Sequence, residues 1–326
     1  MSASAPLTGV VLLNMGGPDS PSAVRPFLAR LFSDRELIRL PAAPLTQPLF
    51  AWIVSGVRAR KVKRYYEEIG GGSPIGRLTE LQRAALEAAL KETSGNFRVY
   101  VGMRYWYPLS KHAVLEMKDD GVAQAIALPL YPQYCAATTG SSIKDLKGWM
   151  RWAKAAFPIK EIRSYPDHPG YVAALSEKIG ETLAGTDPVR RHLLFSAHGI
   201  PKSFVDEGDP YPSEVGRTVT AVMRMFPEVS HSISYQSRAG RAQWLGPDTL
   251  AETARLAREG VKTLVVVPVS FVSDHVETLH ELDIRLKLAA EEAGIGTFLR
   301  VPALNDSPAF IGALKDMVMT ASAGSG

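Results

Sequence analysis

Short apolar runs alternate with helical patterns of apolar and polar positions along the chain. Residues 265–267 are three consecutive valines, which is typical of a strand buried on both faces of a parallel sheet. We predict strands at 10–15, 97–103, 123–130, 159–165, 193–198, 232–236 and 264–271. Helical periodicity follows at 24–32 and 78–90, and again from residue 274. Strands that alternate with helices in this way predict an α/β fold built on parallel sheets.

The second half of the chain repeats the first. Residues 193–201, LLFSAHGIP, are similar to residues 12–18, LLNMGGP, and the strands that follow correspond in order. Pro18 lies 82 residues before Tyr100, whereas Pro201 lies only 31 residues before Ser232. The difference of 51 residues indicates an insertion in the first half. The sequence therefore predicts two similar α/β units, the first of which carries an insertion.

An uncharged segment at 40–57 forms part of that insertion. Its 18 residues reach only the lower limit for a membrane-spanning helix, and its three prolines argue against one. A basic cluster follows, composed of Arg58, Arg60, Lys61, Lys63 and Arg64. Two interpretations stay open, a core helix with a basic outer face or an interfacial membrane anchor. In the second, the side chains that meet the membrane are Leu45, Leu49, Phe50, Trp52 and Ile53.

Composition excludes several classes of protein. The chain has 326 residues, 46% of them hydrophobic, which is enough for one large or two medium domains. Its net charge of +4 is too small to indicate nucleic-acid binding. Cys135 is the single cysteine, which excludes an intrachain disulfide and a four-cysteine zinc or iron–sulfur site and favours a reducing compartment. The N-terminus lacks a basic region before its short apolar run, so we expect no signal peptide.

Candidate catalytic groups follow the predicted strands. His198 ends one strand, and the helix after residues 264–271 carries Asp274, Glu277 and Glu281 on one face. Ligands bind at the carboxyl ends of strands in open α/β sheets, so a ligand is expected near these side chains. A structural histidine and a solvated helix face are the simpler alternatives. The motifs HExxH, GxSxG, GxGxxG and GxxxxGK are absent, and a histidine with carboxylates then favours proton abstraction with transient metal handling.

Six stretches of the chain resemble the ferrochelatase family, whose members insert Fe(II) into a porphyrin in the last step of haem synthesis. They are LNMGGPDSP at 13–21, YYEEIGGGSPI at 65–75, LYPQY with TTGSS at 130–142, FSAHGIP at 195–201, YQSRAG with WLGPDT at 235–249 and FVSDHVETLHELD at 271–283. They occur in the family's order and are spread over most of the chain.

The resemblance implies two Rossmann-like domains, each with a parallel four-stranded sheet flanked by helices. We expect the first domain at 1–165, with an apolar lip at about 40–64. We expect the second domain at 166–326, carrying His198 and Glu277, with the active-site cleft between the two domains.

Site residues are implied by the same resemblance. His198 and Glu277 match the catalytic pair, and both are expected to handle the metal together with Asp274, His275 and Glu281. The residues that match porphyrin-binding positions are Met15, Arg104, Tyr105, Tyr134, Trp244 and Phe271.

The implied reaction converts protoporphyrin IX to protohaem with release of two protons. Met15 stands where the branch of the family that uses coproporphyrin typically has a tyrosine. The uncharged lip agrees with this choice, since protoporphyrin is the more hydrophobic substrate. A coproporphyrin or cobalt chelatase and a non-catalytic tetrapyrrole-binding protein are the alternatives.

The resemblance also sets expectations for cofactors and partners. We expect Fe(II) as a substrate, no tightly bound cofactor and, because Cys135 is single, no iron–sulfur cluster. We expect porphyrin and haem as ligands, contact with a membrane surface and no nucleic acid. We also expect a monomer or a homodimer. We expect it to be cytoplasmic and peripherally associated with the membrane.

Overall fold

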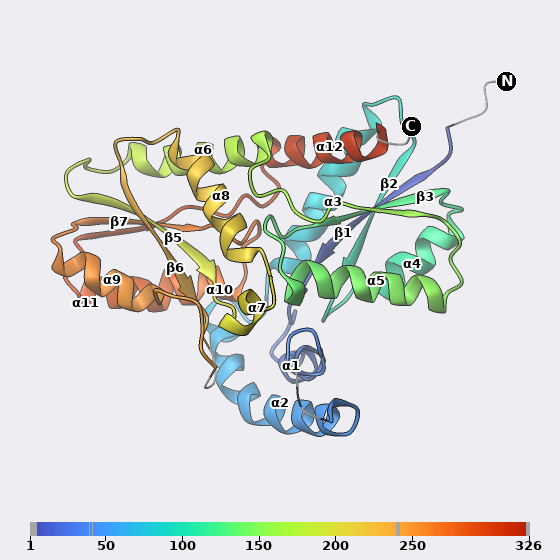
Figure 1. The fold of residues 1–326 in the computed structure, drawn as a ribbon, viewed down its shortest axis with the longest axis horizontal. Coiled ribbons are helices and arrows are strands. Elements are labelled where there is room, and N and C mark those ends of the chain that lie inside the picture. The colour runs from blue at the N-terminus through green and yellow to red at the C-terminus, as the bar shows by residue number, and fades with distance from the viewer. Residues whose placement is uncertain (1–4, 39, 41, 239–241, 324–326) are drawn as a thin grey trace. The chain divides into compact units, whose positions relative to one another are not determined.

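The fold is built on two parallel four-stranded sheets (Figure 1). The structure is a computed structural model that describes residues 5–38, 40, 42–238 and 242–323. The first sheet has the order β2-β1-β3-β4 and the second the order β6-β5-β7-β8. Their strands are β1 (Thr8–Asn14), β2 (Phe97–Met103), β3 (Gln124–Pro129), β4 (Ile159–Glu161), β5 (Arg191–His198), β6 (Ser230–Gln236), β7 (Thr263–Pro268) and β8 (Thr297–Arg300). The same order recurs in both sheets, which confirms the predicted α/β fold with two similar units.

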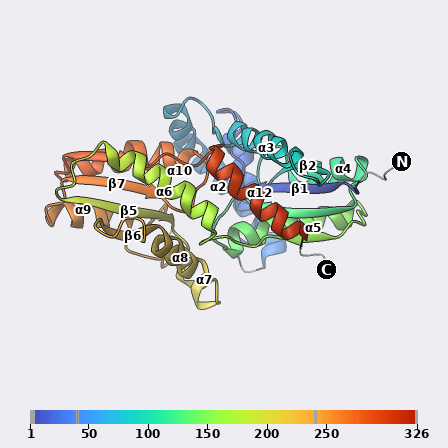
Figure 2. The same ribbon diagram turned by 90° about the horizontal axis from the view of Figure 1, so that it is seen from above.

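Burial explains which strands the sequence predicts well. Every residue of β1 and of β7 is buried, because helices cover both faces of each sheet (Figures 1 and 2). The edge strand β8 has no fully buried residue and lacks the long apolar run of β1 and β7, and sequence analysis missed it. The edge strand β4 ends at Glu161, four residues earlier than predicted.

Helices connect the strands in both units. Those that precede Ser164 are α1 (Val24–Phe32), α2 (Ala43–Glu68), α3 (Ile75–Lys91), α4 (Ser110–Asp119), the π-helical turn η1 (Ala136–Gly140) and α5 (Ser141–Trp152). The later ones are α6 (Pro169–Ala184), α7 (Lys202–Asp206), α8 (Tyr211–Met223), α9 (Thr249–Arg258), α10 (Val276–Leu279), the π-helical segment η2 (Glu281–Leu286), α11 (Lys287–Glu292) and α12 (Pro308–Ala323). Helices α1, α2 and α3 lie between β1 and β2, whereas only α7 and α8 lie between β5 and β6, so the first unit carries the predicted insertion.

The division into units differs from the expected one at the C-terminus. The chain divides between Ser164 and Tyr165, one residue from the expected boundary, but the segment from Asn305 onward belongs to the first unit. Helix α12 packs against α3 and β3 and buries Phe310 and Leu314 completely. The side-chain amide of Gln82 donates to the Asn305 carbonyl at 2.9 Å. The expected second domain, 166–326, is therefore wrong at its C-terminal end.

Helix α2 has an apolar exposed face. Leu49, Trp52 and Ile53 are 60%, 64% and 47% exposed, whereas Gln47 and Ser55 on the opposite face are buried. Of the other residues expected in the lip, Phe50 is half-buried and packs edge-on against Phe32, with 6.3 Å between ring centroids. The side chain of Leu45 lies outside the described residues. Within the part of the chain that the structure describes, no helix is long and apolar enough to span a membrane.

The helix expected from residue 274 begins later and is irregular. His275 has extended backbone angles, and its N–H donates to the Thr278 hydroxyl at 3.0 Å, so α10 starts at Val276. The Arg285 N–H then bonds to the His280 carbonyl, five residues earlier, at 3.0 Å. This wider turn is characteristic of a π-helix, which no simple 3.6-residue pattern predicts.

Candidate active site

His198 and Glu277 meet at the carboxyl ends of two neighbouring strands. His198 is the last residue of β5, and Glu277 lies in α10, just after β7, the strand that pairs with β5. The Gly199 N–H donates to the Gln236 carbonyl at 2.8 Å, and a Cβ on Gly199 would lie only 2.7 Å from that oxygen. Glycine is therefore required here, and it allows β5 to end close against β6.

The imidazole of His198 is held by one carboxylate oxygen. Its Nδ1 lies 2.7 Å from Glu277 Oε2, and the side chains are 35% and 15% exposed. A proton on Nδ1 serves this contact, which leaves the lone pair of Nε2 directed away from Glu277. The ring can therefore accept a proton or bind a metal at Nε2 while the carboxylate fixes its orientation.

Ser237 joins Glu277 to a second carboxylate. Its Oγ lies 2.8 Å from Glu277 Oε2 and 2.5 Å from Glu281 Oε2. Because a hydroxyl carries a single proton, both contacts are satisfied together when Ser237 donates to Glu277 and a protonated Glu281 donates to Ser237. Gln236 supports the same group, since its amide donates to the Glu277 carbonyl at 3.0 Å and to Glu281 Oε2 at 3.3 Å. The four residues form a continuous hydrogen-bonded chain that ends at His198.

The pKa shifts agree with this arrangement. Burial lowers the pKa of His198, but the charge and hydrogen bond of Glu277, together with Glu281, raise it above its usual value. Burial acts on Glu277 in the opposite direction, and the charge and hydrogen bond of His198 hold its pKa at about 2. Burial and the neighbouring Glu277 raise the pKa of Glu281. One carboxyl group is thus kept ionised, and the pKa of the next is raised.

The residues predicted to handle the metal are only partly brought together. His275 is buried, its Nε2 lies 4.0 Å from Glu277 Oε1, and burial lowers its pKa. Asp274 instead pairs with Arg300, with Oδ1 3.0 Å from Nη1. Among the described residues, no group of three or more histidine, cysteine, aspartate or glutamate side chains is arranged to hold a metal ion. The metal-handling roles of these residues stay predictions.

The predicted porphyrin-binding residues of the second unit lie beside the hydrogen-bonded chain that ends at His198. The ring of Phe271 meets the ring of His198 edge-on, with 6.3 Å between centroids, and lies 4.7 Å from that of His275. The ring of Trp244 lies close to Gly199, 3.5 Å from where a Cβ would be built, and its backbone forms a bridge with Pro201. Aromatic side chains therefore border the His198 imidazole.

The corresponding residues of the first unit follow β1 and β2. The Tyr105 N–H donates to the Met15 carbonyl at 2.9 Å, and the guanidinium of Arg104 lies over the Tyr105 ring. Arg104 also pairs with Asp34 at 3.0 Å, and the buried Tyr105 hydroxyl donates to the same carboxylate at 2.7 Å. Tyr134 packs against a different cation, Arg163, at 5.0 Å. Porphyrin contact by these side chains stays a prediction.

Sequence reasoning missed Ser237, Gln236 and Asp34. Gln236 ends β6 and Ser237 directly follows it, so the rule that placed His198 at a strand end could also have pointed to them. Asp34 lies in the segment after α1, far in sequence from Arg104 and Tyr105, and no local pattern marks it. Only the fold brings its carboxylate to those two side chains.

Comparisons with known proteins agree with one another. The family model described as Ferrochelatase matches residues 7–322. The protein named Ferrochelatase of Geotalea uraniireducens is 49% identical over 95% of this chain and 97% of its own. That of Synechococcus sp. strain RCC307 is 45% identical over 97% of this chain and 83% of its own.

Solved structures support the fold alone, because their sequences are distant. SirB from Bacillus subtilis, solved with Fe³⁺, is similar with a TM-score of 0.59 at 11% identity, covering 98% of this chain and 96% of its own. CbiX, described as the terminal enzyme of sirohaem biosynthesis in denitrifying bacteria, has a TM-score of 0.52 at 14% identity, covering 96% and 98%. Both agree with two chelatase-like domains.

Proposed function

We propose that this chain, which belongs to the ferrochelatase family, inserts Fe(II) into protoporphyrin IX to give protohaem. The reaction is the last step of haem synthesis. The observation that carries the proposal is the contact between His198 and Glu277 at the strand ends. In this contact an ionised Glu277 holds the imidazole through Nδ1, and Nε2 is directed away from the carboxylate.

The chemistry needs two protons to leave the macrocycle. Two pyrrole N–H bonds break as Fe(II) forms bonds to the ring nitrogens, and the oxidation state of iron does not change. His198 Nε2 accepts the two protons in turn and loses the first before it takes the second, and the Glu277 carboxylate stabilises the imidazolium formed each time. Once Glu281 has lost its own proton, the Nδ1 proton of His198 passes to Glu277, and Ser237 accepts it while it donates its hydroxyl proton to Glu281. Fe(II) is a substrate here, and imidazole and carboxylate are both suitable transient ligands for it.

Met15 and the apolar face of α2 support protoporphyrin IX over coproporphyrin III as the substrate. Met15 supplies a thioether where a tyrosine hydroxyl would suit a more polar macrocycle. Coproporphyrin carries four carboxylates and protoporphyrin only two. Protoporphyrin is therefore the more hydrophobic of the two and suits an apolar entrance better. We expect the exposed face of α2, with Leu49, Trp52 and Ile53, to serve as this entrance.

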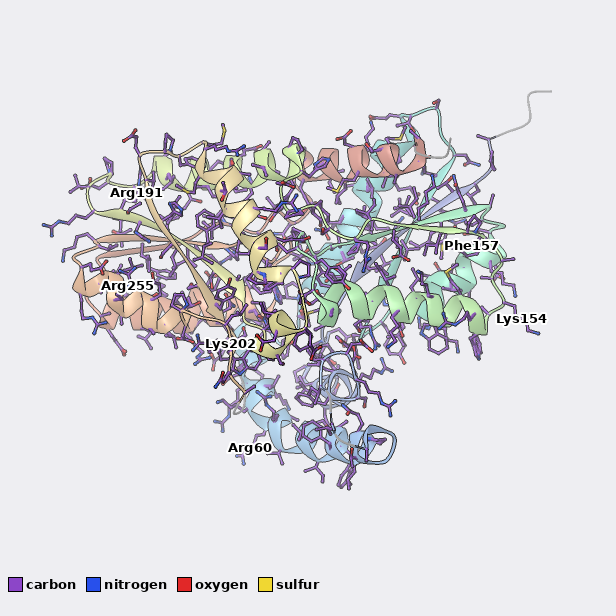
Figure 3. The ribbon with its side chains drawn as sticks, in the orientation of Figure 1. Arg60, Lys154, Phe157, Arg191, Lys202 and Arg255 are labelled. Carbon is purple, nitrogen blue, oxygen red and sulfur yellow. The ribbon has the colours of Figure 1, made fainter. Side chains whose placement is uncertain are left out.

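The same face of α2 supports peripheral contact with a membrane. A helix that exposes Trp52 and buries Gln47 has its polarity reversed relative to an ordinary surface helix. The basic cluster that follows is exposed on the same helix, and Arg60 belongs to it (Figure 3). Apolar residues beside basic ones suit an interface with anionic lipid. We propose a cytoplasmic protein that binds the membrane surface, as a monomer or homodimer, without a tightly bound cofactor.

Anaerobic turnover with two porphyrins tests the proposal. Purified protein is given Fe(II) with either protoporphyrin IX or coproporphyrin III, and the loss of the free-porphyrin spectrum is followed. A higher kcat/KM for protoporphyrin IX supports the proposal. Preference for coproporphyrin III would overturn the substrate and leave the chelatase, whereas binding of either without insertion would leave a tetrapyrrole carrier. The same assay with Co(II) identifies a cobalt chelatase.

A further inference from the structure

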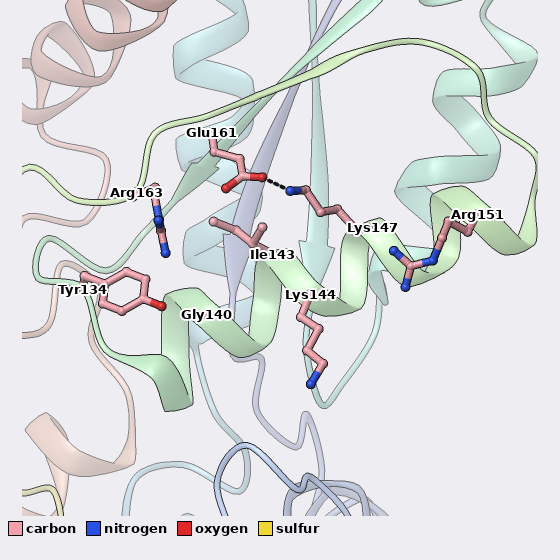
Figure 4. A pocket seen from close by; sticks show the side chains of 8 residues that line it. All are labelled: Tyr134, Gly140, Ile143, Lys144, Lys147, Arg151, Glu161 and Arg163. Carbon is pink, nitrogen blue, oxygen red and sulfur yellow. Dashed lines mark ion pairs between the residues drawn. The ribbon is translucent and has the colours of Figure 1, made fainter. Parts of the chain in front are cut away.

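A basic cavity lies in the first unit beside the edge strand β4. It has a volume of about 370 Å³ and lies between α5 and the chain after β4 (Figure 4). The polar side chains that line it are Tyr134, Lys144, Lys147, Arg151, Glu161 and Arg163. None of the cations belongs to the proposed catalytic chain around His198.

The cavity owes its charge to the spacing of residues on α5. Lys144, Lys147 and Arg151 follow one another at intervals of three and four, so they lie along one side of the helix. Figure 4 shows Lys147 directed toward Glu161 and Lys144 directed away from it. Arg163 faces them from the chain after β4. These four cations meet a single lining carboxylate, that of Glu161, which gives the wall a net charge of +3.

Two of the four cations have carboxylate partners. Lys147 pairs with Glu161, and Lys144 pairs with Glu36 outside the cavity. Arg163 lies over the Tyr134 ring at 5.0 Å, a contact that leaves its N–H donors available. No carboxylate among the described residues pairs with Arg151. Two guanidinium groups without a carboxylate partner therefore border one cavity, and their combined positive potential favours an anion there.

We propose that this cavity binds a compact polyanion that carries at least two phosphate or carboxylate groups. Guanidinium groups form paired hydrogen bonds to either kind of oxyanion, and Lys147 can leave Glu161 to add a third contact. Tyr134 and Ile143 supply an apolar wall for the remainder of the ligand. The volume is at the small end of the range of about 300–1,000 Å³ for ligand pockets, which suits a compact anion and not a macrocycle.

Calorimetric titration of the full chain tests this site with two probes, inorganic pyrophosphate and citrate, at constant ionic strength. We expect saturable binding of at least one probe at a single site, and the tighter probe distinguishes a phosphate ligand from a carboxylate ligand. Arg151→Gln and Arg163→Gln should each weaken binding about tenfold, because each removes a charge-assisted contact. Arg224→Gln, an exposed cation in the second unit, is the matched control and should leave binding unchanged.

Glu161→Gln provides a test of opposite sign. It removes the only carboxylate of the lining and frees Lys147, so binding should become several-fold tighter. A merely structural role for the Lys147–Glu161 pair predicts weaker or unchanged binding. Absence of saturable binding by both probes, weaker binding in Glu161→Gln, or equal losses in Arg224→Gln and Arg151→Gln would overturn the proposal. Thermal unfolding of each variant shows whether it remains folded.

Discussion

At the residue scale, the charge of His198 depends on the two carboxylates near it. Sequence analysis made His198 and Glu277 candidates because both follow predicted strands, and the resemblance to the ferrochelatase family implied that they form the catalytic pair. It could not predict the 2.7 Å contact, since the two residues are 79 positions apart and only the pairing of β5 with β7 brings them together. Ser237 was missed although it follows β6 directly, because a serine at a strand end is not by itself a catalytic signal.

Replacement of Glu277 should change the pKa of His198 in a defined direction. The pKa is raised in the intact protein, so Glu277→Gln removes the main group that raises it and leaves burial opposed only by Glu281. We expect the pKa to fall below its ordinary value of about 6.5. NMR titration of the imidazole measures it, and His192, whose pKa is held at about 4 chiefly by burial, is the internal control. An unchanged or higher pKa for His198 would contradict this.

The same shifts fix how the pair contributes to stability with pH. His198 has a raised pKa, so its contribution is complete below about 6.5 and is lost as pH rises through the folded value. Glu277 has a lowered pKa, so its contribution is present above 4.5 and is lost as pH falls toward about 2. Urea denaturation should therefore show that the stability lost in Glu277→Gln is greatest between these limits. A loss that is constant from pH 3 to 9, within the precision of about 0.5 kcal/mol, would contradict it.

Ser237 offers two substitutions that separate its hydroxyl from its backbone. Its φ of 65° is a left-handed conformation that costs an L-residue about 1 kcal/mol or more. Ser237→Ala and Ser237→Gly both remove the link between Glu277 and Glu281, so kcat should fall about tenfold in each while porphyrin affinity is kept. Ser237→Gly should be the more stable by about 1 kcal/mol. If either variant keeps full kcat, Ser237 has no part in proton transfer.

At the scale of single elements, the hydrophobic pattern predicts a strand or helix well where its surroundings are uniform. The buried strand β7 was predicted to within a few residues, because all its side chains face protein. The segment η2 was not, because a π-helix differs from an α-helix in hydrogen bonding and not in composition. For α2 the residue pattern alone left a core helix and an interfacial anchor open, and the exposure of Leu49, Trp52 and Ile53 favours the second.

Charge on the exposed face of α2 should weaken membrane binding. Trp52 is 64% exposed, so Trp52→Glu leaves the core intact while it removes apolar area from the proposed interface. We expect vesicle affinity to fall about tenfold, because the variant loses one aromatic side chain that the proposed interface buries in the membrane. Co-sedimentation with vesicles that contain anionic lipid measures it. Val189→Glu, at an equally exposed apolar residue of the second unit, is the control. Equal affinity of both variants and the unchanged protein would rule out α2 as the anchor.

At the scale of the whole molecule, the internal repeat predicted two similar α/β units, and the two sheets have the same strand order. The sequence did not reveal that the last helix returns to the first unit. Helix α12 follows β8 directly in the chain, and its apolar pattern does not say which sheet it covers. The partners of Phe310 and Leu314 are set by tertiary packing on α3 and β3.

Phe310→Ala tests to which unit α12 belongs. The side chain is completely buried, so its truncation should destabilise the first unit by about 3–5 kcal/mol. Hydrogen exchange followed by mass spectrometry should then show lost protection in α3 and β3 and unchanged protection in β5 and β7. Loss confined to β5 and β7 would place α12 with the second unit instead.

The most direct measurement is Fe(II) insertion by His198→Ala, with porphyrin binding measured on the same sample. The imidazole supplies the free nitrogen at the end of the hydrogen-bonded chain, so kcat should fall about 10²- to 10⁴-fold while the porphyrin dissociation constant stays within a few-fold. His231→Ala, at an exposed histidine of β6, should retain activity. Near-normal insertion by His198→Ala would show that His198 is not the proton- or metal-handling group.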